Sequence, residues 1–83
     1  MKLNLLYFAR LRDEFGLESE HLDSDAATVE ELLVELRLRG EVWARELAAD
    51  RGFRVAVNQQ MARLDSALSD GDEVAVFPPV TGG

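Results

Sequence analysis

The sequence predicts an α+β fold, in which a mixed sheet packs against one main helix and several short helices. Two observations lead to this prediction: alternating apolar segments open and close the 83-residue chain, and one capped amphipathic helix lies between them. The first and last strands carry apolar residues on both faces, which is typical of central strands. The helix provides the long crossover that parallel pairing of these two strands requires. A chain of this length forms one small domain.

The opening segment, 2–8, reads as a strand because its side chains divide cleanly between two faces. These faces are Leu3, Leu5 and Tyr7 on one side, and Asn4, Leu6 and Phe8 on the other. Residues 9–15 predict a short helical turn that ends at Gly16, since glycine adopts the left-handed conformation that stops a helix. Residues 17–22 form a weaker strand candidate.

The clearest local signal is the start of the main helix. Thr28 and Glu31 match a capping box, in which two side chains satisfy free amides of the first turn. The apolar residues that follow at helical spacing are Val29, Leu32, Leu33 and Leu36. They form one buried stripe, and Gly40 is expected to close the helix. Residues 41–49 predict a second short helix, to which Trp43 contributes as core filling.

The second half of the chain predicts three more strands. Residues 53–58 alternate in polarity, and a tight turn separates them from a short edge strand at 61–65. The turn Ser69–Asp72 leads into the last strand, 73–77. Pro78 then ends this strand, because proline has no N–H to donate to the ladder.

This order of elements is that of the β-grasp, or ubiquitin-like, fold, with residues 1–77 as the domain and 78–83 as an extended C-terminal tail. The tail consists of Pro78, Pro79, Val80, Thr81, Gly82 and Gly83. The proline pair favours a stiff polyproline geometry, and the β-branched pair favours extension. The two glycines have no Cβ, so they pass a constriction that other residues would block. We therefore expect an arm that threads its tip into the active site of another protein.

Composition argues against several classes of partner and chemistry. Sixteen acidic residues against nine basic ones give a net charge of −7, which would repel a nucleic acid. The chain has no cysteine and one histidine, His21, so we expect neither a thiolate nucleophile nor a metal site. The apolar stretches are too short for a membrane span or a signal-peptide core, which leads us to expect a cytoplasmic protein.

The chemistry available to the tail is that of the carboxylate at Gly83. A carboxylate is a poor electrophile, so acyl chemistry there requires activation, for example by ATP to an acyl-adenylate. No glycine-rich phosphate loop is present, so a separate activating enzyme would use the ATP. The acyl group would then pass to an amine, as in a protein modifier, or to sulfide, as in a sulfur carrier. A terminal thiocarboxylate holds sulfur without a cysteine.

Two segments, Val55–Gln59 and Leu68–Gly83, closely resemble the family of small subunits of molybdopterin synthase. The likeness spans the chain in order, through Tyr7-Phe8-Ala9, Arg12, the helix start at Thr28-Val29-Glu30 and the helix of Trp43. The Asp-Gly-Asp-Glu-Val turn is common to ubiquitin-like sulfur carriers in general, whereas the ending Phe-Pro-Pro-Val-Thr-Gly-Gly is more specific to this subunit.

The resemblance implies a sulfur-donating subunit that performs no catalysis alone and binds no cofactor. An adenylyltransferase of the ubiquitin-activating type would make the acyl-adenylate at Gly83, and a persulfide donor would convert it to the thiocarboxylate. The tail would then enter the large subunit of the synthase and deliver sulfur to cyclic pyranopterin monophosphate, which forms the dithiolene of molybdopterin. The family assembly is a heterotetramer with two copies of each subunit.

Strand geometry also predicts a docking surface. If the first and last strands pair, Phe8, Ala75 and Phe77 face the same way, with Met61 nearby on the edge strand. The alternative is that Phe8 or Phe77 packs under the helices. The complete set of expected partner-binding residues is Phe8, Met61, Phe77, Pro78, Pro79, Val80 and Thr81.

Other functions stay open at this point. The chain would serve as a protein modifier if Gly83 were joined to lysines, or as a sulfur carrier for tRNA thiolation or the thiazole of thiamine. A plain ubiquitin-like interaction module would need neither Gly82 nor Gly83. A stand-alone enzyme is least favoured, because no nucleophile–base pair or ligand cluster is visible.

Overall fold

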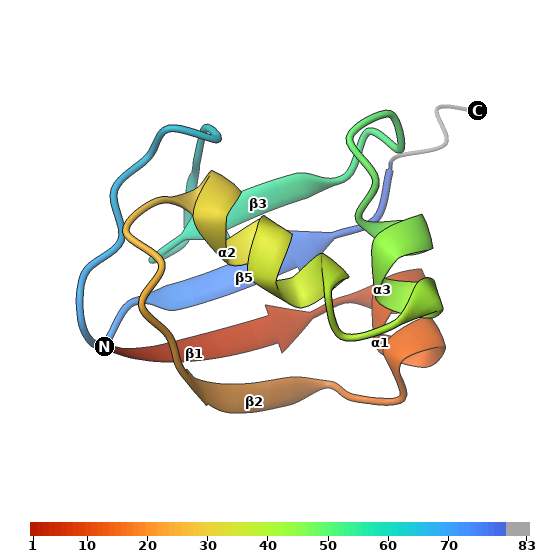
Figure 1. Ribbon diagram of the computed structural model, residues 1–83, viewed down its shortest axis with the longest axis horizontal. Coiled ribbons are helices and arrows are strands. Elements are labelled where there is room, and N and C mark those ends of the chain that lie inside the picture. The colour runs from red at the N-terminus through yellow and green to blue at the C-terminus, as the bar shows by residue number, and fades with distance from the viewer. Residues whose placement is uncertain (80–83) are drawn as a thin grey trace.

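The computed structural model describes residues 1–79 and contains a five-stranded mixed sheet with three helices (Figure 1). The elements in chain order are β1 (Lys2–Tyr7), α1 (Ala9–Phe15), β2 (Ser19–Asp23), α2 (Val29–Arg37), α3 (Glu41–Glu46), β3 (Arg54–Val57), β4 (Gln60–Met61) and β5 (Glu73–Phe77). The strand order in the sheet is β2-β1-β5-β3-β4. This is the β-grasp arrangement, so the predicted fold class is confirmed.

The first and last strands lie side by side at the centre of the sheet. β1 and β5 pair in parallel, with Leu5 opposite Val74 and Tyr7 opposite Val76. β2 and β3 flank them in antiparallel pairing. Because β1 and β5 run in the same direction, the end of β1 and the root of the tail lie at the same edge of the molecule.

The helices cover one face of the sheet, and the core lies between the two layers (Figure 1). The strands contribute residues that are at most 1% exposed: Leu3, Leu5, Tyr7, Val74 and Val76. The helix α2 contributes the apolar stripe predicted from the sequence, of which Leu36 is fully buried. Trp43 packs at the border of this core, where its ring stacks on that of Phe15 with centroids 3.8 Å apart.

The local signals at the helix ends agree in part with the structure. The Glu31 amide donates to the Thr28 hydroxyl oxygen at 3.3 Å, and that hydroxyl donates to the Glu31 carboxylate at 3.2 Å. Gly16 has the predicted left-handed conformation, with φ of 67°. The expectation for Gly40 was wrong: α2 ends at Arg37, and Gly40 is the N-cap of α3. The predicted helix 41–49 is also shorter, because α3 ends at Glu46.

The edge strand β4 is shorter than predicted and begins one residue earlier. Asn58 and Gln59 have φ of 50° and 69°, the conformation of a two-residue hairpin turn, so Gln60 already pairs with β3. After Met61 the chain leaves the sheet for the start of α2, where the Leu64 carbonyl accepts from an α2 amide at 2.9 Å. None of the helices within residues 1–79 is long and apolar enough to cross a bilayer.

Candidate functional site

Two aromatic rings stack on the face of the sheet that the helices leave open. The rings of Phe8 and Phe77 lie with centroids 4.7 Å apart and planes 8° from parallel. Phe8 is 39% exposed and Phe77 is half-buried. The stack stands at the ends of β1 and β5, beside the root of the tail.

A row of apolar side chains continues this surface across the sheet. The strand register places Leu6 opposite Ala75, Ala75 opposite Ala56, and Ala56 opposite Met61. Directly opposite residues share a face, so the row crosses β1, β5, β3 and β4. Met61 at its end is 62% exposed. We call this surface the sheet patch, and it consists of Leu6, Phe8, Ala56, Met61, Ala75 and Phe77.

The sequence predicted Phe8, Ala75 and Phe77 on one face with Met61 nearby, and in the structure all four lie on this face. The alternative, in which Phe8 or Phe77 packs under the helices, is wrong because both rings lie on the opposite face. Met61 is separated from Phe77 by β3. The sequence placed Leu6 on the face of Phe8, but Leu6 was not included in the predicted docking surface. Ala56 was missed, although its alternation with the buried Val55 pointed to this face. Partner binding by the patch stays a prediction.

A backbone bend carries the chain from the open face to the helix layer. The Phe8 amide donates to the Val76 carbonyl at 3.2 Å, so Phe8 is held beside β5. Ala9 then has φ of 50°, a left-handed conformation that is uncommon for a residue with a Cβ. The bend allows α1 to pack on the helix side while the Phe8 ring stays on the open face.

The tail root rests against the loop that precedes β3. Pro78 and Pro79 are half-buried, and a Cβ on Gly52 would lie 3.9 Å from that of Pro79. Gly52 has φ of +74°, which glycine adopts without strain. The predicted tail residues Val80, Thr81, Gly82 and Gly83 lie outside the described residues.

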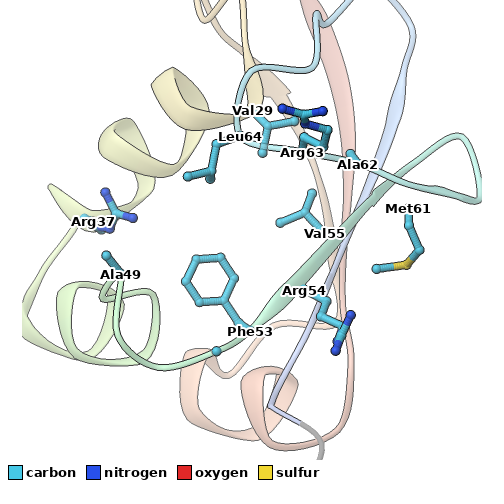
Figure 2. A pocket seen from close by; sticks show the side chains of 11 residues that line it. Val29, Arg37, Ala49, Phe53, Arg54, Val55, Met61, Ala62, Arg63 and Leu64 are labelled. Carbon is cyan, nitrogen blue, oxygen red and sulfur yellow. The ribbon is translucent and has the colours of Figure 1, made fainter.

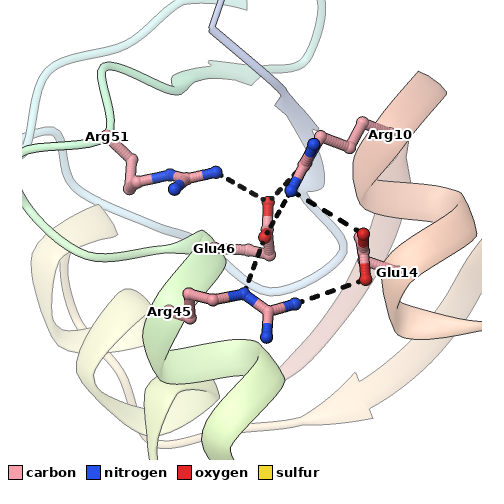
Figure 3. Close-up of polar contacts among 5 residues, drawn as sticks. All are labelled: Arg10, Glu14, Arg45, Glu46 and Arg51. Carbon is pink, nitrogen blue, oxygen red and sulfur yellow. Dashed lines mark hydrogen bonds and ion pairs between the residues drawn. The ribbon is translucent and has the colours of Figure 1, made fainter.

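A buried carboxylate holds together the elements around the tail root (Figure 3). Glu46 is 1% exposed and accepts hydrogen bonds from Arg10 and Arg45 at 3.1 Å and from Arg51 at 3.4 Å. Arg45 also pairs with Glu14. The hydrogen bond from Arg10 is the main cause that lowers the pKa of Glu46 below its usual value. The network joins α1, α3 and the loop before β3.

A second polar network fixes Tyr7 in the core. The Tyr7 hydroxyl donates to the Glu20 carboxylate at 2.7 Å, and Arg39 donates to both oxygens of the same carboxylate at 2.7 and 2.8 Å. Burial raises the pKa of Tyr7, with a further rise from Glu20. Burial also favours protonated Glu20, but the bonds from Arg39 and Tyr7 outweigh it and lower the pKa of Glu20. A phenol held neutral in this way is not a nucleophile.

The described part of the chain therefore combines a partly exposed apolar surface with a tail root that packs against the loop before β3. Among residues 1–79 no cluster of acidic residues and histidine has the arrangement of a metal site. His21, the one histidine, is exposed and contacts the Asn4 side chain.

Comparison with known proteins adds a family and named relatives. The ThiS family model matches residues 5–83. The molybdopterin synthase sulfur carrier subunit of Haemophilus influenzae is 45% identical, over 98% of this chain and 99% of its own. The subunit of the same name from Escherichia coli is 41% identical over the same shares. The small archaeal modifier protein 3 of Haloferax volcanii is 38% identical over the full length of both chains.

Solved structures show the same fold. A solution structure of a Haloferax volcanii protein has a TM-score of 0.85 and 35% identity, over 100% of this chain and 87% of its own. The crystal structure of SAMP1 from the same organism has a TM-score of 0.82 and 31% identity over the full length of both chains.

Proposed function

Since the chain belongs to the ThiS family, we propose that it is the sulfur-carrier subunit of a molybdopterin synthase. The observation that carries this proposal is the 45% identity, over nearly the whole chain, to a relative with that name. The sheet patch at the root of a tail that ends in two glycines supports it, because such an arrangement suits a subunit that presents its tail to a partner.

The reactive group in this proposal is the carboxylate of Gly83. A partner adenylyltransferase of the ubiquitin-activating type uses ATP to convert it to an acyl-adenylate and releases pyrophosphate. The outer sulfur of a persulfide donor then displaces AMP from the acyl carbon, and a thiol reduces the resulting acyl disulfide to the thiocarboxylate. The tail delivers this sulfur to cyclic pyranopterin monophosphate in the large subunit, where two such transfers form the dithiolene. The chain itself contributes the acyl group and no catalytic side chain.

The sheet patch acts in this proposal as the docking surface for both partners. The partly exposed stack of Phe8 and Phe77 lies next to the tail root, and the exposed Met61 side chain lies beyond β3 on the same face. Apolar areas of this kind mark protein–protein contacts. Docking there fixes the direction in which Pro78 and Pro79 leave the domain. The hydrogen bonds of Glu46 stabilise the same region, because one of them fixes Arg51 in the loop against which Pro79 packs.

Intact-mass measurement tests the proposed chemistry. Protein incubated with ATP, an adenylyltransferase of this type, a persulfide donor and a reducing thiol is expected to gain the mass of one oxygen-to-sulfur exchange at Gly83. Substitution of Gly82 by Trp should abolish sulfur transfer in the reconstituted synthase, since the side chain blocks a narrow channel, while the folded domain is unchanged. Normal synthase activity of Gly82→Trp would contradict the threading argument.

A second candidate function is that of a protein modifier, favoured by the 38% identity to a small archaeal modifier protein. Lysine adducts in place of the sulfur exchange would support it. Lys2 is the only lysine of the chain and lies at the end of β1 remote from the tail root. Any lysine-linked chain of copies would therefore join Gly83 of one copy to Lys2 of the next, and Lys2→Arg would prevent it.

A further inference from the structure

The edge of the sheet next to β3 is only partly covered. β4 pairs with Ala56 and Val57, and the last bond on this side runs from the Ala62 amide to the Val55 carbonyl at 2.9 Å. The chain then departs for α2. Within residues 1–79, no strand lies beside the first half of β3 on this side.

A cavity of about 380 Å³ lies along this open edge (Figure 2). Phe53, Val55 and Leu64 line it on the helix side of β3, whereas Arg54 and Met61 lie on the other side of the strand. Side chains of a strand alternate between the two faces of a sheet. A cavity bordered from both faces therefore has the shape that one further strand would fill.

The cavity is cationic, although the chain as a whole carries a charge of −7. Three of the nine basic residues, Arg37, Arg54 and Arg63, line it. Arg54 forms no ion pair with any residue of the described range 1–79. Arg63 pairs only with Asp65, at 3.4 Å between two highly exposed side chains. The guanidinium groups of Arg54 and Arg63 therefore stay available to an anionic partner.

We propose that the open edge of β3 binds an extended peptide segment of a partner protein, in which apolar residues alternate with acidic ones. The segment adds as a strand beside Phe53–Val55. Its apolar side chains enter the helix side of the cavity, against Phe53 and Leu64, and its carboxylates face Arg54 on the other side. Main-chain bonds to an exposed edge give such binding its affinity, and alternate side chains give its specificity. The site borders the sheet patch, because Met61 belongs to both and Arg54 lies opposite Phe77, but its proposed ligand takes no part in the sulfur chemistry of Gly83.

Nuclear magnetic resonance titration of the full chain tests this proposal. The probe is the acetylated and amidated peptide Glu-Val-Asp-Val-Glu-Val. The amide signals of Phe53, Val55 and Leu64 are expected to shift, and the Val55 amide is expected to exchange more slowly with deuterium. Val55 reports strand addition directly, because its carbonyl already faces this edge and the N–H of a strand residue points to the same side as its carbonyl.

Two controls separate the charge from the shape of the site. The peptide with Gln and Asn in place of its acidic residues should bind more weakly. Arg54→Glu should weaken binding about three- to tenfold, whereas Arg12→Glu, the same charge change on exposed α1, should change it less than about twofold. Unchanged exchange at Val55, equal binding of the neutral peptide, or equal losses in both variants would overturn the proposal. The intact-mass measurement reports only on sulfur at Gly83, whereas this titration reports only on peptide binding at β3. Either proposal can therefore be refuted without the other.

Discussion

The two faces of the sheet come from the same strands and carry similar apolar residues, but large side chains are fully buried on one face only. On the helix side Leu5, Tyr7 and Val76 are at most 1% exposed. On the open side the Phe8 ring and the Met61 side chain stay accessible. The difference arises from the helices, which cross one side only. Burial on one face stabilises the fold, and the other face is left free for a partner. Changes on the two faces should therefore have opposite consequences for folding and for binding.

The largest effect on stability is expected from the helix side. Leu36→Ala removes a fully buried side chain between α2 and the sheet and should lower the free energy of unfolding by about 3 kcal/mol, because it leaves a cavity. Urea denaturation followed by circular dichroism measures this loss. Val34→Ala, at a half-exposed position of the same helix, is the matched control. An equally large loss of stability in Val34→Ala would show that burial does not decide the cost of these substitutions.

The next effect concerns the buried carboxylate at the tail root. Glu46→Gln should lower the free energy of unfolding by about 2 kcal/mol at neutral pH, since hydrogen bonds to a charged group are lost. The pKa of Glu46 is lower in the folded state than the ordinary glutamate value of 4.5. The ionised Glu46 side chain therefore stabilises the fold fully above pH 4.5, and this stabilisation is lost as the pH falls through the folded-state pKa. The difference between Glu46→Gln and the parent should therefore shrink below pH 4.5 in denaturation curves. A constant difference down to pH 2 would contradict this assignment.

A smaller loss is expected at the start of α2. Thr28→Ala removes the hydroxyl that caps the Glu31 amide and should cost about 1 kcal/mol. Thr28→Ser keeps the hydroxyl and should be close to neutral. Thermal unfolding of the two variants side by side tests the cap, and equal melting temperatures would show that the hydroxyl contributes nothing.

Substitutions on the open face are expected to have the smallest effect on stability and the largest effect on affinity for a partner. Phe8→Ala removes one ring of the partly exposed stack and should cost about 0.5 kcal/mol in stability. Affinity for the large subunit of a synthase should fall by at least tenfold, as for a central aromatic contact. Calorimetric titration of the folded variant measures this. If Phe8→Ala unfolded the domain while its folded fraction kept the same affinity for the large subunit, Phe8 would be a core residue and the proposed role of the open face would be wrong.

Local signals explain why much of the fold could be predicted from the sequence. The capping residues at Thr28, the stop at Gly16 and the strand end before Pro78 each depend on neighbours within a few residues, and all three agree with the structure. The pairing of β1 with β5 also followed, since only central strands are apolar on both faces.

The remaining features depend on contacts between distant segments. β4 ends at Met61 because the following residues are held by the start of α2. Glu46 looks like a surface residue of a short helix, and only Arg10 and Arg51, brought in from other elements, explain its burial. The open edge of β3 was missed for the same reason. Of the candidate site, the Phe8–Phe77 face followed from alternation, whereas the roles of Gly82 and Gly83 rest on sequence resemblance alone.

The position of β5 between β1 and β3 has a consequence for synthesis in the cell. Until residues 73–77 have left the ribosome, the antiparallel pair of β1 and β2 and the hairpin of β3 and β4 have no strand to join them. Such non-local closure is a late step of folding. An enzyme that requires the assembled domain therefore cannot act on a chain that lacks β5.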